Sequence, residues 1–106
     1  MTRIDLSFSR GNLLYAGCRI KKDEKGYLTL DMPLSTAVGL LQRNVEAALS
    51  LVPLGEREAI CLTGYADGWA FMVAQQVIIR KGYTKVYYLE GNKHEEKEER
   101  VLIYSA

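Results

Sequence analysis

The sequence predicts a single α/β domain, and three apolar runs support this fold class. Residues 59–63 form a short run typical of a buried strand, residues 69–79 a run too long for a strand, and residues 85–89 another short run. A strand, a helix and a strand in this order predict a parallel βαβ unit, because a right-handed crossover brings the two strands side by side. At 106 residues, the chain corresponds to one domain, 1–106.

The first third of the chain is predicted to be β structure. Residues 4–8 alternate apolar and polar side chains, and a glycine turn separates them from a second extended run at 13–20. We therefore expect these two runs to pair as a hairpin. The charged stretch 21–26 predicts another turn, after which residues 27–32 either extend the sheet or add an edge strand before Pro33.

A first helix is predicted after these strands. Apolar residues recur at spacings of three and four from Val38 to Val52. Ser35 or Thr36 can cap this helix, which we expect to end near Leu51. Its opposite face is polar, so one side is expected to pack on a sheet and the other to face solvent.

The end of the chain completes the predicted order of elements. Residues 93–100 are almost all charged and predict an exposed turn or arm, which leads into a last strand at 101–104. The predicted fold is therefore ββ(β)αβαββ, a mixed sheet with a central parallel βαβ unit of the Rossmann-like kind.

Composition and charge exclude several classes of function. A net charge of +1 argues against duplex nucleic acid or an anionic membrane as a partner. No apolar run approaches the roughly 18 residues of a membrane span, and no apolar signal region is seen, so we expect a cytoplasmic protein. Two cysteines without CxxC spacing suggest neither a zinc site nor a disulfide framework, and a single histidine argues against metal catalysis. We expect no cofactor.

The turn between the buried strand at 59–63 and the following helix is the leading candidate ligand site. Open α/β sheets bind ligands at the carboxyl ends of their strands. Glycines allow a close backbone approach, and the first helical turn offers N–H groups to a phosphate. The alternative is a purely structural turn with a capping aspartate and a core tryptophan. The candidate ligand-binding residues are Thr63, Gly64, Tyr65, Ala66, Asp67, Gly68 and Trp69.

Three further side chains are candidates for chemistry. Glu90 follows the predicted strand 85–89, where a carboxylate can orient a ribose hydroxyl or act as a general base, or simply end the strand at the surface. Cys61 is either a nucleophile or a buried structural thiol. His94 is either a proton shuttle or a solvated residue of the charged stretch.

The helix at 69–79 carries little polar surface, since only Gln75 and Gln76 interrupt its apolar run. Its second face is expected to lie under another element or in a subunit interface. A chain of this size has few elements left to cover it, which favours a homodimer.

Thr63-Gly64, followed after four residues by Trp69, resembles the Ser/Thr-Gly-x-x-x-x-Trp signature of the small CRISPR-associated ring nucleases, which bind and linearise cyclic tetra-adenylate. The similarity of layout covers nearly the whole chain. It implies a cyclic oligoadenylate ligand, a role in type III CRISPR antiviral defence, and ring cleavage without a metal. Glu90-Gly91-Asn92 stands where the family has Asp-Pro-Arg, so the carboxylate of Glu90 is the catalytic candidate. A homodimer would match the two-fold axes of such a ring.

A weaker likeness covers residues 59–91. Cys61-Leu62-Thr63-Gly64 with the strand that follows resembles the C-terminal half of a rhodanese-type sulfurtransferase, which implies Cys61 as a persulfide carrier. A non-enzymatic α/β interaction module is the second alternative.

Overall fold

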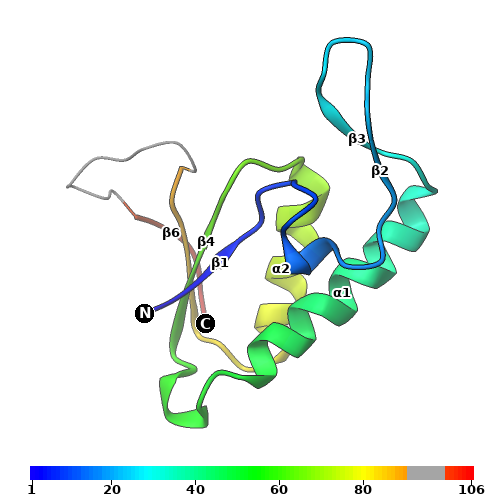
Figure 1. The fold of residues 1–106 in the computed structure, drawn as a ribbon. Helices are drawn as coiled ribbons and strands as arrows, with labels where there is room; N and C mark the ends of the chain where they lie inside the picture. Colours follow the sequence, from blue (N-terminus) through cyan, green and yellow to red (C-terminus); the bar gives the residue numbers. More distant parts are fainter. Residues whose placement is uncertain (91–99) are drawn as a thin grey trace.

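The fold is built on a four-stranded sheet with the strand order β1-β4-β5-β6 (Figure 1). The computed structural model describes residues 1–90 and 100–106. Strands β1 (Thr2–Asp5), β4 (Ala59–Thr63) and β5 (Lys85–Tyr88) run parallel, and β6 (Val101–Ser105) pairs with β5 in the antiparallel direction. The mixed sheet and its parallel β4–β5 pair confirm the predicted α/β class.

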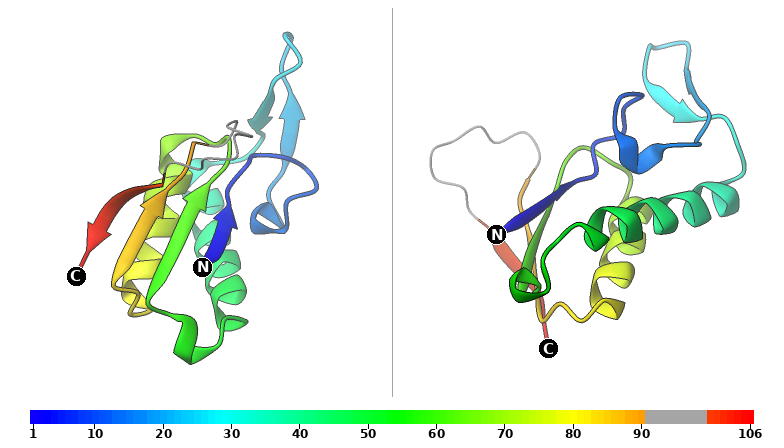
Figure 2. Two further views of the ribbon diagram at one scale, coloured as in Figure 1. Left: turned by 90° about the vertical axis from the view of Figure 1, so that its left-hand side faces the viewer. Right: turned by 60° about the horizontal axis from the view of Figure 1, so that its bottom comes forward.

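Two helices cover one face of this sheet. Helix α1 (Leu34–Ser50) connects to β4, and helix α2 (Gly68–Arg80) joins β4 to β5. Figure 2 shows both helices on the same side of the strands. The order β1-β4-β5 advances in one direction, so right-handed crossovers bring both helices to one face. In doubly wound sheets the ligand crevice usually lies where the strand order reverses. The order β1-β4-β5 contains no such reversal.

The hydrophobic core lies between the sheet and the two helices. Ile60 and Leu62 of β4 pack there with Leu41 of α1 and Val77 of α2, and each is at most 1% exposed. Cys61 points to the other face, because side chains alternate along a strand, and it is also only 1% exposed. Burial of the middle of β4 on both faces confirms the sequence prediction.

The beginning of α1 differs from the prediction. Its N-cap is Pro33, and no side chain caps the helix. The Thr36 amide donates to the Pro33 carbonyl at 3.1 Å, so Ser35 and Thr36 lie inside the first turn. The predicted cap is wrong because the fixed φ of proline, here −59°, already suits the start of a helix. The end at Ser50 lies one residue from the predicted end.

The predicted hairpin between residues 4–8 and 13–20 is also wrong. Strand β1 pairs with β4 instead, and residues 13–15 form the short 3-10 helix η1 (Leu13–Tyr15). Asn12 caps η1, with its side-chain oxygen accepting from the Leu14 amide at 3.1 Å, so the expected hairpin turn is a helix start. The alternating pattern of residues 4–8 identified an extended segment but not its partner.

The antiparallel hairpin of this chain is formed by β2 (Ile20–Lys22) and β3 (Leu28–Leu30). It confirms a strand within residues 27–32 but places it in a separate two-stranded sheet. The hairpin projects from the body of the domain beyond the first turns of α1 (Figure 1). Within the described part of the chain, no helix has the length and apolarity needed to cross a bilayer.

Candidate functional site

The carboxyl ends of β1, β4 and β5 meet at one edge of the sheet. Backbone pairing continues past the strands, since the Leu6 amide donates to the Thr63 carbonyl and the Phe8 amide to the Tyr65 carbonyl, both at 2.8 Å. On the other side of β4, the Leu89 amide donates to the Leu62 carbonyl at 3.0 Å. The turn after β4 therefore lies between the chain that follows β1 and the chain that follows β5.

Gly64 shapes this turn through a close contact within the protein. It is buried and has a φ of +112°. A Cβ at this position would meet the Asp5 carboxylate, the Ser7 nitrogen at 2.5 Å and the Ser7 Oγ at 2.8 Å. The sequence motif suggested that this glycine admits a ligand, but the space beside it is filled by the end of β1. The Ser7 hydroxyl oxygen also accepts a hydrogen bond from the Tyr65 amide at 3.1 Å, and this bond helps to fix the turn.

A pocket of about 440 Å³ opens beside this turn. Its size falls within the roughly 300–1,000 Å³ common for small-molecule sites. Three aromatic rings from three separate parts of the chain contribute to its walls. The described lining residues are Phe8, Gly26, Tyr27, Leu28, Tyr65, Ala66 and Asp67.

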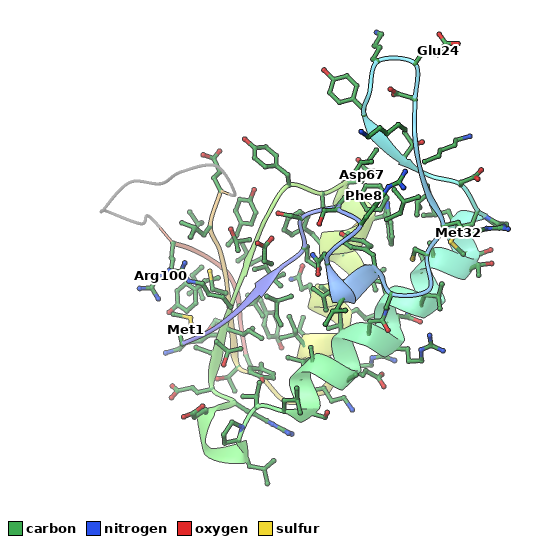
Figure 3. All side chains as sticks on the ribbon, in the orientation of Figure 1. Met1, Phe8, Glu24, Met32, Asp67 and Arg100 are labelled. Carbon is green, nitrogen blue, oxygen red and sulfur yellow. The ribbon has the colours of Figure 1, made fainter. Side chains whose placement is uncertain are left out.

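Asp67 supplies the charge of this pocket. It is the N-cap of α2, but its side chain makes no capping hydrogen bond, and only its backbone carbonyl accepts, from the Ala70 amide at 3.0 Å. Figure 3 shows Asp67 and Phe8 together at the start of α2. Asp67 therefore occupies the N-cap position, but its carboxylate does not cap the helix by a hydrogen bond as the structural alternative predicted.

The negative charge of Asp67 also acts on Tyr15. The Tyr15 hydroxyl donates to the Leu6 carbonyl at 2.5 Å, and its ring packs edge-to-face on Phe8 with 5.0 Å between centroids. Burial raises the pKa of Tyr15 well above its ordinary value, and the charges of Asp67, Cys18 and Asp5 raise it further. Tyr15 therefore stays neutral, and it holds the Leu6 backbone by a hydrogen bond and packs against Phe8, which lines the pocket.

The hairpin contributes Tyr27 through a well-defined turn. The Asp23 carboxylate accepts from the Lys25 and Tyr27 amides, both at 2.9 Å, and Gly26 has a φ of +85°. The Tyr27 side chain is 68% exposed, so its ring is available to a ligand. The sequence analysis missed both Phe8 and Tyr27. The spacing of Asp23 and Gly26 is a recognisable turn signal for Tyr27, whereas Phe8 depends on the pairing of β1 with β4.

The remaining predicted site residues lie outside this pocket. Thr63 ends β4, Gly68 begins α2, and Trp69 is half-buried against the hydrophobic core. Glu90 is exposed after Leu89 at the same edge of the sheet, but it does not belong to the described lining. Of the seven predicted ligand-binding residues, the structure brings three into the pocket wall: Tyr65, Ala66 and Asp67.

The other candidates for chemistry receive less support. Cys61 lies inside β4 and is 1% exposed, so its thiol is not presented as the nucleophile of a sulfurtransferase. His94 and the rest of 91–99 fall outside the described residues. In the part of the chain that the structure describes, no three His, Cys, Asp or Glu side chains gather to hold a metal ion.

Comparison of the chain with protein-family models, curated proteins and solved structures gives no match. Function is therefore inferred from the geometry of this sheet edge together with the motif of Thr63, Gly64 and Trp69.

Proposed function

We propose that this chain binds a cyclic oligoadenylate, cyclic tetra-adenylate in the first instance, at the carboxyl edge of β4 in type III CRISPR defence. The observation that carries the proposal is the aromatic pocket beside the turn of residues 65–67. This turn belongs to the motif that resembles the ring nucleases, and the Rossmann-like description of β4, α2 and β5 belongs to the same proposal.

Aromatic rings provide the contact surface for the bases. Phe8, Tyr27 and Tyr65 come from the end of β1, the hairpin and the β4 turn. Stacking of a nucleobase on an aromatic side chain contributes about 1–3 kcal/mol per base, and it acts on the uncharged face of the base rather than on its phosphate. This agrees with a chain whose net charge is only +1.

The phosphates would lie toward the first turn of α2 rather than inside the pocket. The carboxylate of Asp67 repels an anion, whereas the N-terminal turn that begins at Gly68 carries partial positive charge. A ligand that carries both bases and phosphates can place each group where the local electrostatics favours it.

A homodimer belongs to this proposal, because two copies related by a two-fold axis would present identical pockets to a ring that has two-fold axes. Met72 on α2 is 67% exposed and borders a shallow surface with Ile79 and Arg80. This surface is the proposed contact between copies. The apolarity of α2 does not by itself require it, because α2 packs on both α1 and the sheet.

Titration of the protein with cyclic tetra-adenylate in a calorimeter tests the proposal. We expect one ring per two chains, and Tyr65→Ala should weaken binding about tenfold or more through the loss of one stacking surface. The matched control is Leu54→Ala, an exposed apolar truncation in the short helix η2 (Leu54–Glu56), which precedes β4 at the opposite end of the strand.

Ring opening can be followed by chromatography in the same samples. In that reaction a ribose 2′-hydroxyl attacks the adjacent phosphorus, the O2′–P bond forms and the P–O5′ bond breaks, which leaves a 2′,3′-cyclic phosphate. Glu90 is the proposed acceptor of the hydroxyl proton, and the leaving 5′-oxygen takes a proton from water. Absence of any heat, and of any rise in melting temperature, with cyclic tetra-adenylate would contradict the proposed function.

A further inference from the structure

The carboxylate of Asp67 indicates which chemical group of a ligand this pocket would select. We propose that the pocket is a nucleobase subsite in which Asp67 accepts a hydrogen bond from an exocyclic amino group of the base. This inference rests on the proposed function and deepens it, because it assigns the choice of base to one residue. In a cyclic oligoadenylate the donor is the N6 amino group of adenine.

The Asp67 carboxylate is available to accept a hydrogen bond from a ligand. Its side chain does not cap α2, and within the described residues it forms neither a side-chain hydrogen bond nor a salt bridge. The other described lining residues carry no charge. An ionised carboxylate can only accept hydrogen bonds, and this one lies beside three aromatic rings.

This combination matches a base better than a phosphate. The rings of Phe8, Tyr27 and Tyr65 suit the flat faces of a base, whereas the carboxylate repels an anion. Adenine presents an amino donor where hypoxanthine presents the acceptor O6. A carboxylate placed to accept from the 6-amino group therefore favours adenine, because hypoxanthine offers an acceptor at that position and its nearest ring donor, N1–H, lies one atom further around the ring. Guanine also carries an exocyclic amino group, so a direct comparison must separate the two purines.

An organic ammonium ion is the competing ligand for aromatic rings beside a carboxylate. The position of Asp67 at the N-cap of α2 favours the base, because the next residue, Gly68, begins the helical turn whose partial positive charge suits a phosphate. A nucleotide can place its base in the aromatic pocket beside Asp67 and its phosphate at the first turn of α2. An ammonium ion suits only the pocket, because the partial positive charge of the helical turn repels it.

The test compares cyclic tetra-adenylate with its inosine counterpart, which differs only in the bases, on wild-type protein and on Asp67→Asn. We expect wild type to bind the adenine ring about tenfold or more tightly, because the inosine ring leaves the carboxylate facing an acceptor. An asparagine can accept or donate, so Asp67→Asn should bind the two rings with nearly equal affinity. Glu56→Gln, a carboxylate-to-amide change in η2 outside the pocket, should keep the wild-type preference.

The outcomes of these titrations distinguish an error in the Asp67 subsite from an error in the proposed cyclic ligand. Equal affinity of wild type for both rings, or an unchanged preference in Asp67→Asn, would overturn the subsite while leaving ring binding in place. If wild type binds neither ring, adenosine monophosphate, guanosine monophosphate and choline are titrated in turn. Binding of adenosine monophosphate that weakens in Asp67→Asn supports the subsite without the cyclic ligand, and a preference for guanosine monophosphate assigns the amino group to guanine. Binding of choline alone, or of none of the three, overturns the subsite.

Discussion

At the residue scale, Gly64 and Gly68 occupy the same turn but face different surroundings. Gly64 has a positive φ and touches the backbone of Ser7, whereas a Cβ on Gly68 meets nothing within 4 Å. The two glycines therefore form a natural pair of variants, one strained and one unstrained.

We expect Gly64→Ala to lower the free energy of unfolding by about 3 kcal/mol, from backbone strain together with overpacking against Ser7. Gly68→Ala should leave stability unchanged or raise it, because alanine favours a helix more than glycine does. Urea denaturation measures both values. Equal stability of the two variants would show that the close approach of β1 to this turn is not a constraint.

Tyr15 links stability to alkaline pH. Burial and nearby acidic groups raise its pKa, so folding favours the neutral phenol. Its contribution is fully present below the pKa of an unfolded tyrosine, about 10, and is lost as the pH rises toward the higher folded value. Burial also raises the pKa of Tyr83, partly offset by Arg57, and gives the same sign.

We therefore expect the free energy of unfolding to fall as the pH rises above about 10, and to fall less steeply in Tyr15→Phe. This variant should also lose about 1–3 kcal/mol at pH 8, because the buried Leu6 carbonyl loses its side-chain donor. Denaturation curves at pH 8, 10 and 11 provide both readouts. Parallel pH profiles of wild type and variant would refute the role of Tyr15 in the alkaline loss.

At the element scale, the hairpin of β2 and β3 is a separate unit that reaches the pocket. It forms its own two-stranded sheet, and its turn is held by the Asp23 carboxylate. Isolated two-stranded hairpins are at best marginally stable. The hairpin is thus expected to open locally, without unfolding of the main sheet.

Asp23→Ala should speed amide hydrogen exchange within residues 20–30 while the amides of β4 keep their protection. It should also weaken ligand binding, because Tyr27 loses its fixed position. Asp31→Ala is the matched control, since within the described residues its side chain forms only an exposed pair with Lys21 at 3.7 Å, and its backbone bond to Arg19 survives the change. Faster exchange in β4 as well would show that hairpin and sheet open together.

At the scale of the whole molecule, the proposed homodimer would bring two pockets to one ring. Sedimentation should give a species of twice the 12.0 kDa chain mass, at least with the ring bound. Met72→Lys should shift it to the mass of one chain, because a charge would be buried in the proposed contact. Leu54→Lys, an apolar-to-charged change at an exposed residue of η2 outside the proposed contact, should leave the mass unchanged. A wild-type monomer with and without the ring would contradict the homodimer.

The local sequence by itself determined the elements from β4 onward. The apolar runs at 59–63, 69–79 and 85–89 correspond closely to β4, α2 and β5, because burial and helical or strand periodicity are properties of neighbouring residues. The candidate ligand turn was predicted from the same local pattern. Its ligand and its chemistry stay predictions.

The βαβ pattern also predicted the parallel pairing of β4 with β5, but only the tertiary structure decided the partner of β1. Whether β1 pairs with residues 13–20 or with β4 depends on contacts across more than fifty residues, which no local pattern contains. The same non-local pairing places Phe8 beside Tyr65, brings in Tyr27 from the hairpin, and leaves Trp69 against the core. The sequence thus located one wall of the candidate site, and the packing of distant segments supplied the others.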